Sequence, residues 1–418
     1  MQRLHAVDAL RALALLGVLA VNIWYFAFPE NLSGSGRSAG AETAPADQWV
    51  AFAATTLFEG KSYVVFSFLF GLSFVLQWGS AHRSGASEVT RSVRRFIGLI
   101  VLGLLHGIFL FVGDILLAYA LLGFALLGLR RIGTRAALTL AAALWLIVAL
   151  AILGLGGLTL ALASSSMVDP AALDAAAMST SAEAAREAYT GGLGSYLAFQ
   201  LSAYGLVAPS TLIVQGPVAF AAFLLGLVLG RGRLLERIMA GEIPTARLLR
   251  LALLALAVGG ALSVTAAWLT WGAPWTPQEP GQRSVGGLGM ETLGGGLIFL
   301  AGPIQATGYV VVALLILRQP QFGWLVRALA PAGSMSLSNY LGQSLVLAVL
   351  FSVLGAPLGL GLAGQLSASQ VGLVVVGLWT VQLGLSGLWL RRFSRGPVEF
   401  PLRAWTYAEP RRRNHPSA

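Results

Sequence analysis

The amino-acid sequence predicts an all-α integral membrane protein, a polytopic bundle of about ten transmembrane helices. Of its 418 residues, 56% are hydrophobic and only 11% are charged, and the mean hydropathy is +0.77. This apolar share exceeds what the core of a soluble domain needs. The apolar residues form uncharged stretches of roughly 17 to 25 residues, the length that a helix needs to cross the ~30 Å core of a bilayer. Short arginine clusters separate these stretches, as in the cytoplasmic loops of membrane proteins.

Ten stretches are candidate membrane helices. The first follows Arg3 and Arg11 and is long enough to span a bilayer, which favours a membrane helix over a cleaved signal peptide. Residues 96–129 are expected to form two helices, because the tripeptide Val112–Asp114 can turn the chain. The predicted spans are residues 10–28, 55–78, 96–111, 115–129, 136–161, 206–229, 248–270, 293–317, 331–352 and 371–390.

The arginines are distributed unequally between the two sides of this predicted bundle. With a hairpin at 96–129, every arginine except Arg37, Arg186 and Arg283 falls on one side. A single span there would invert all later loops and remove the asymmetry. By the positive-inside rule, both termini are therefore expected to be cytoplasmic.

Composition also excludes several classes of protein. The chain has no cysteine, so disulfides, thiolate metal sites and a cysteine nucleophile are ruled out. Its four histidines do not occur at zinc-ligand spacing, and no metal site is predicted. The net charge of +10 comes from separated clusters rather than one basic face, so no nucleic-acid partner is expected. The sequence has neither a glycine-rich phosphate loop nor a G-x-S-x-G nucleophile elbow.

Four ionisable residues fall at predicted membrane depth, where charge is costly and often functional: Glu59, Lys61, His106 and Asp114. His106 suits a general base for acyl transfer, a proton relay, or a histidine that only packs between helices. Lys61 either snorkels to the interface or presents its charge to an acyl carbonyl or an anionic substrate, beside Glu59 as a substrate contact. Asp114 either orients this chemistry or caps the following helix.

Polar residues near helix ends and within spans form a second group of candidates. Asn22, Asn339 and Gln343 either bond neighbouring helices or contact a polar substrate. Asp8 and Arg11, three residues apart, either clamp the first helix or contact a cofactor phosphate. Other basic residues expected near such a phosphate are Arg94, Arg95, Arg391 and Arg392. The glycine pairs Gly103/Gly107 and Gly226/Gly230 permit close helix packing.

The predicted organisation has three regions. Residues 1–130 hold the first helices, and residues 131–320 hold central helices with two long outer loops at about 164–195 and 271–292. Residues 321–418 form a C-terminal region that ends in a basic tail.

Several separated motifs resemble those of the YeiB-like bacterial membrane proteins, a family defined by a domain of unknown function. The resemblance runs nearly end to end and is most specific in the C-terminal third. It is carried by Asp8–Gly17, Val21–Ile23, Glu59–Lys61, Phe66–Gly71, Arg94–Arg95, Gly103–Gly107, Gly113–Leu116, Ser336–Ser344, Trp389–Phe393, Gly396–Glu399 and Thr406–Tyr407. It implies a multi-pass protein of the bacterial plasma membrane.

The first helices of this family are similar to the transmembrane acyltransferase superfamily, which includes heparan-alpha-glucosaminide N-acetyltransferase and the acyltransferase-3 proteins. This similarity implies that Asp8 and Arg11 lie on the acyl-CoA side. It also implies that Asn22 occupies the late first-helix position where relatives have a catalytic residue.

The leading hypothesis is acyl transfer from cytosolic acetyl-CoA or another acyl-CoA to an extracytoplasmic sugar, lipid or small-molecule acceptor. In this hypothesis, His106 is the general base, Lys61 or Asn22 lies near the acyl carbonyl, and the arginines attract the CoA phosphates. The alternatives are a transporter or exporter of a small amphiphile, with or without coupling to protons, and a non-catalytic membrane partner protein. A homo-oligomer is compatible with each of them.

Overall fold

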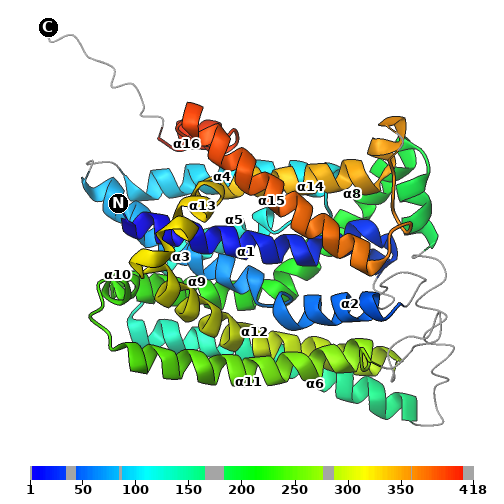
Figure 1. The fold of residues 1–418 in the computed structure, drawn as a ribbon, viewed down its shortest axis with the longest axis horizontal. Coiled ribbons are helices and arrows are strands. Elements are labelled where there is room, and N and C mark those ends of the chain that lie inside the picture. Colours follow the sequence, from blue (N-terminus) through cyan, green and yellow to red (C-terminus); the bar gives the residue numbers. More distant parts are fainter. Residues whose placement is uncertain are drawn as a thin grey trace, which may run out of the picture.

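The computed structural model describes residues 2–33, 44–83, 87–164, 183–275, 287–358 and 360–407. Helices make up the regular structure of this described part, and many of them run side by side along the long axis of the molecule (Figure 1). Eight helical segments within it are long and apolar enough to cross a membrane. The predicted all-α polytopic fold is thus confirmed.

Eight of the ten predicted spans correspond to these segments. Two segments are each made of two helices. The segments are α1 (Gln2–Ala27), α2 (Pro45–Leu57) with α3 (Ser62–Arg83), α4 (Glu88–Phe109), α6 (Thr134–Ser164), α8 (Leu193–Ser210) with α9 (Gly216–Arg231), α11 (Thr245–Trp271), α12 (Gly287–Leu317) and α15 (Ala368–Arg392).

The other two predicted spans differ from the structure. The hairpin at 96–129 is confirmed, but its second helix, α5 (Leu116–Gly128), has 13 residues. At 1.5 Å per residue it is about 20 Å long, too short for a full crossing. Residues 331–352 belong to two helices, α13 (Gly323–Ser334) and α14 (Ser336–Phe351), which meet at a bend of 74°. Hydropathy measures only apolar content, so it could not predict this change in the direction of the helix axis.

Two of the long segments break near their middles. Between α2 and α3, Gly60 adopts a φ of 77°, which glycine reaches without strain and other residues rarely do. Between α8 and α9, residues Thr211–Gln215 form a π-helix, two residues after Pro209. Non-α backbone at membrane depth is tolerated where it is buried in protein or lines a cavity.

Close contacts between glycines and neighbouring backbones hold the bundle together. A Cβ added at Gly71 of α3 would lie 2.2 Å from the Phe223 carbonyl oxygen of α9, and one at Gly226 of α9 would lie 2.2 Å from the Phe68 carbonyl oxygen of α3. The two helices therefore cross almost backbone to backbone, as the predicted close packing at Gly226 requires.

The last described helix, α16 (Glu399–Tyr407), lies at the end of the bundle where α1 begins (Figure 1). Which side of the membrane this end faces stays a prediction from the arginine distribution. Most of the two predicted outer loops and the basic tail at 408–418 lie outside the described residues.

Candidate functional site

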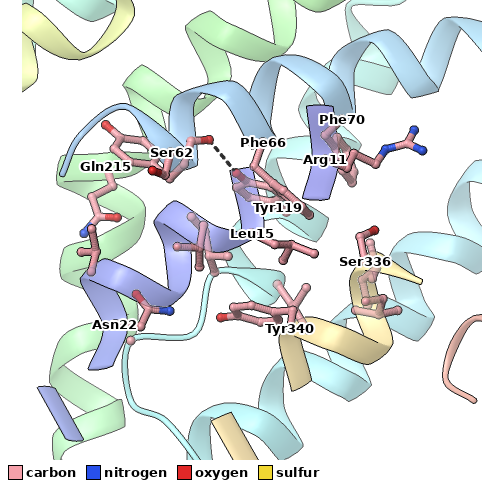
Figure 2. Close-up of a pocket in the computed structure, with 18 of the residues that line it drawn as sticks. Arg11, Leu15, Asn22, Ser62, Phe66, Phe70, Tyr119, Gln215, Ser336 and Tyr340 are labelled. Atoms are coloured by element: carbon pink, nitrogen blue, oxygen red, sulfur yellow. Dashed lines mark hydrogen bonds between the residues drawn. The ribbon is translucent and has the colours of Figure 1, made fainter. Parts of the chain in front are cut away.

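A central cavity of about 710 Å³ lies between the helices. Its lining residues on α1 run from Arg11 to Tyr25, 14 residues apart, so it follows that helix for about 21 Å. Figure 2 shows Arg11 and Ser336 toward one side of the close-up and Asn22 and Gln215 toward the other. We call these the arginine end (Arg11, Arg95, Arg403) and the amide end (Asn22, Asn31, Gln215).

The irregular parts of the helices line this cavity. Gly60 comes from the break between α2 and α3, Gly113 from the turn between α4 and α5, and Gln215 from the π-helix before α9. Ser334 and Ser336 flank the bend between α13 and α14. Backbone that departs from α-helical geometry thus lies beside the cavity, as is expected of irregular segments at membrane depth.

Three guanidinium groups contribute to the arginine end. Arg11 pairs with Asp8 on its own helix and donates to Ser73 Oγ at 2.6 Å. Arg95 lies over the Phe70 ring, 5.0 Å from its centroid, and Arg403 lies 4.3 Å from the Tyr407 centroid. Within the described residues, no carboxylate forms an ion pair with Arg95 or Arg403. This end therefore has an excess of positive charge.

The middle of the cavity is mainly apolar. Leu15, Phe66 and Leu116 form part of its wall, and the Tyr119 hydroxyl there lies 2.6 Å from Ser67 Oγ. Side-chain amides and hydroxyls become frequent again at the amide end, where Asn22 lies (Figure 2). A cationic end, an apolar middle and a polar end match an amphiphile with an anionic headgroup.

His106 and Asp114 form a buried pair across the α4–α5 turn. His106 Nδ1 lies 2.8 Å from Asp114 Oδ1, and Asp114 Oδ2 accepts the backbone N–H of Leu117 at 2.9 Å. Asp114 therefore both orients the imidazole and caps α5. A carboxylate accepts hydrogen bonds, so this contact suits the tautomer of a neutral imidazole with the proton on Nδ1, in which Nε2 is an acceptor.

This pair lies one side chain away from the cavity. Neither His106 nor Asp114 lines the cavity, whereas Tyr340 does, and its ring centroid is 4.9 Å from that of His106. His106 Nε2 is buried and has no hydrogen-bond partner in the described part of the chain. Tyr340 thus lies between the central cavity and a histidine whose Nε2 has no partner among the described residues.

Neither Lys61 nor Glu59 lines the central cavity. Lys61 is fully buried, and its Nζ donates to the Thr55 carbonyl at 2.9 Å. Glu59 lines a second cavity of about 320 Å³ together with Trp24, Trp271 and other residues. The two cavities share the residues Val21, Tyr25 and Asn31. They therefore lie next to each other.

The predicted polar contacts of α14 bond neighbouring helices. Asn339 Nδ2 donates to Ser386 Oγ at 3.0 Å, and Gln343 Nε2 donates to Gln382 Oε1 at 2.8 Å, both on α15. Neither Asn339 nor Gln343 lines either cavity.

The predicted cytoplasmic arginines separate into two sets. Arg95 lines the central cavity, whereas its neighbour Arg94 does not, although its backbone carbonyl accepts a hydrogen bond from Trp405 Nε1 at 3.0 Å. Arg391 and Arg392 are exposed at the end of α15, away from both cavities.

Sequence reasoning missed many of the residues that line the cavity, among them Tyr119, Tyr340, Glu399 and Arg403. Tyr340 and Glu399 belong to motifs that carried the family resemblance, and this was the only sequence signal for them. No pattern in the sequence indicated that α16 returns to the cavity.

Comparisons with known proteins agree with the motif resemblance. Residues 229–409 match the family model described as "Protein of unknown function (DUF418)". The chain is 26% identical to "Uncharacterized protein YxaH" of Bacillus subtilis (strain 168), covering 97% of this chain and 94% of that protein. It is 28% identical to "Uncharacterized protein YeiB" of Escherichia coli (strain K12), covering 97% of each.

No solved structure matches the chain. The similarity to transmembrane acyltransferases stays a prediction. The resemblance to YeiB-like membrane proteins is confirmed, by the DUF418 match over residues 229–409 and by similarity to YxaH and YeiB along almost the whole chain.

Proposed function

We propose that this protein is a multi-pass acyltransferase of the bacterial plasma membrane, which moves an acyl group from cytosolic acyl-CoA to an acceptor on the other side. The observation that carries the proposal is the central cavity, which joins a cationic end to a polar end through an apolar middle. A molecule whose anionic head is bound at the arginine end would direct its acyl group toward Asn22.

The arginine end suits the phosphates of the donor. Guanidinium groups bind phosphate with charge-assisted, often bidentate hydrogen bonds, and these are strongest where water is excluded. Arg95 and Arg403 have no carboxylate partner within the described residues, so an incoming anion would compensate their charge.

The reaction itself is a simple exchange. The acceptor oxygen or nitrogen attacks the thioester carbonyl, the carbon–sulfur bond breaks, and an ester or amide forms. His106 Nε2 takes the acceptor's proton and returns it to the departing thiolate, which leaves as CoA–SH. Asp114 holds the imidazole in the required tautomer through its 2.8 Å contact with Nδ1.

Because Tyr340 separates His106 from the cavity, the proton must pass through its hydroxyl or its ring must move aside. A Tyr340→Phe variant distinguishes these routes. It abolishes transfer if the hydroxyl relays the proton, and it retains transfer if only displacement of the ring is needed.

The test is binding of acetyl-CoA to the purified protein in detergent, followed by detection of released CoA–SH. Replacing Arg95 by Gln should weaken binding by about tenfold or more, since a hydrogen bond to a charged group contributes roughly 1.5–3 kcal/mol. Arg94→Gln is the matched control on the same helix, because Arg94 does not line the cavity. Absence of saturable binding by a folded, wild-type sample would refute the proposal.

A second function, transport of a small amphiphile, is favoured by a different observation. The turn at Gly60 interrupts the helix near the middle of one long segment and lines the cavity, and α13 and α14 meet beside the cavity at a bend of 74°. Discontinuous helices around a central site are typical of secondary transporters. Ligand flux that depends on a proton gradient and consumes no acyl-CoA would support this alternative.

A further inference from the structure

We infer that α16 is a movable cover over the arginine end of the cavity, and that its Arg403 completes an anion-binding site with Arg11 and Arg95. The ligand group is a phosphate or a similar anionic headgroup on an amphiphile. The inference rests on the proposed function only in taking the cavity's ligand to be anionic. It holds equally for acyl transfer and for transport.

α16 supplies part of the cavity wall. Glu399, Leu402 and Arg403 all line the cavity, although they follow the last membrane-spanning segment. Leu402 fits against Gly98 of α4, and its Cδ1 lies 2.4 Å from where a Cβ at Gly98 would be. Because Gly98 has no side chain, Leu402 can pack directly against the backbone of α4, and this contact positions α16 over the cavity.

Beside the packing of Leu402, polar contacts hold α16 in this position. Glu399 Oε1 accepts the backbone N–H groups of Leu337 and Ser338, at 2.8 and 3.0 Å, at the start of α14. Trp405 Nε1 donates to the Arg94 carbonyl, and the Arg91 guanidinium lies 4.5 Å from the Tyr407 ring centroid. Water can replace each of these contacts when the helix moves away, unlike those of a buried apolar seam.

The other face of α16 suits a membrane interface. Phe400 is 62% exposed and Trp405 is 51% exposed. Amphipathic aromatic side chains such as Trp are enriched at the membrane–water interface, at the level of the headgroups. An interfacial position would keep α16 close to the cavity while it is open.

The charges point to the ligand. Arg11, Arg95 and Arg403 come from three different helices and line the same cavity end, where Glu399 is the one acidic lining residue in the described chain. That carboxylate is already engaged by α14. Positive charges that converge without enough counter-charge cost free energy, and an anion bound between them offsets this cost. A headgroup held by all three arginines also holds α16 closed, because one of them is on the cover.

A reversible lock tests whether the cover moves. The natural chain has no cysteine, so Gly98→Cys with Leu402→Cys introduces only one possible disulfide. Cross-linking before adding CoA should abolish its uptake, and reduction should restore it. Cross-linking after loading should trap bound CoA. Each single-cysteine variant, treated identically, is the control. If the two cysteines do not form a disulfide on oxidation, a short cross-linker with two thiol-reactive groups joins them instead. Unchanged uptake in verified cross-linked protein would overturn the inference.

A second experiment needs no CoA and therefore separates this inference from the proposed function. A Leu15→Cys reporter in the cavity is treated with anionic and cationic methanethiosulfonate reagents. Glu399→Gln should speed modification by both reagents, and Arg403→Gln should reduce the preference for the anionic one. The matched controls Glu242→Gln and Arg395→Gln, outside the cavity, should change neither rate.

The outcomes of the two experiments are distinct. If Glu399→Gln and Arg403→Gln change the modification of the Leu15→Cys reporter but the protein does not bind CoA, the inference stands and acyl-CoA is refuted as the ligand. CoA binding with a reporter insensitive to Glu399→Gln and Arg403→Gln would refute the cover. Inorganic phosphate and vesicles of anionic phospholipid, compared as protectants of the reporter, distinguish a soluble phosphate from a lipid headgroup.

Discussion

Charged residues inside the helix bundle are stabilised in different ways. Lys61 donates to the Thr55 carbonyl near the end of α2, where helical carbonyls lack intrahelical partners. Asp114 uses one oxygen for His106 and the other for the start of α5. Arg95 instead lies against an aromatic ring and lines the cavity. Of these residues, Arg95 is therefore the one whose charge faces space for a ligand.

We expect Asp114→Asn to reduce acyl transfer by about 10²–10⁴-fold, the usual contribution of an acid–base residue, because the neutral amide no longer fixes the histidine tautomer. The amide oxygen can still cap α5, so the protein should remain folded. Single-turnover release of CoA–SH measures the effect. Tyr204→Phe is the control, since it removes only a hydroxyl that donates at 3.4 Å to the Gly103 carbonyl of α4, the helix that carries His106. Undiminished turnover in Asp114→Asn would remove the pair from the mechanism.

A second change separates structural from catalytic roles at Lys61. Lys61→Met leaves the Thr55 carbonyl buried without this donor, which should cost about 1–3 kcal/mol of stability. The melting temperature in detergent should fall, while residual folded protein should still bind acetyl-CoA. A stable Lys61→Met protein that binds acetyl-CoA but transfers nothing would instead support the catalytic role predicted from the sequence.

At the scale of helices, close crossings and breaks act together. α3 and α9 pack almost in backbone contact through Gly71 and Gly226, and both belong to segments that break near their middles. The irregular parts of the same segments, at Gly60 and Gln215, line the central cavity.

Gly226→Ala should lower the melting temperature, because its methyl group would lie 2.2 Å from the Phe68 carbonyl oxygen and force α3 and α9 apart. Overpacking of this kind costs about 1–3 kcal/mol. Gly260→Ala is the matched control in α11, where an added Cβ meets nothing within 4 Å. Its stability should be equal or slightly higher, because alanine favours a helix over glycine. Equal losses in the two variants would contradict the proposed crossing.

For the molecule as a whole, the arginine distribution predicts its orientation in the membrane. We expect single cysteines at Gly133 and Gln319 to be labelled from the cytoplasmic side and one at Gly192 from the opposite side. The cysteine-free chain makes such labelling with impermeant reagents unambiguous. Cytoplasmic labelling at Gly192 would invert the topology and, with it, the side from which the arginine end is filled.

The sequence by itself determined the membrane class, eight of the ten spans and the turn that joins α4 to α5, because these depend on local apolar length and charge. The sequence offered Asp114 either as a group that orients the chemistry of His106 or as a helix cap, and the structure shows that it contacts His106 and also caps α5. Of the predicted site residues, Arg11, Arg95 and Asn22 line the central cavity, Glu59 lines the second one, and the others face neighbouring helices or solvent or are buried outside the cavities.

Only the tertiary structure decided which polar residues meet the cavity. Arg94 and Arg95 are neighbours in sequence, yet only Arg95 lines it, because the direction a helical residue faces is fixed by packing against distant helices. The return of α16 to the cavity depends on the packing of Leu402 against Gly98 and the carboxylate contact of Glu399 with α14. Both are contacts between residues far apart in the chain, and local composition carries no information about them.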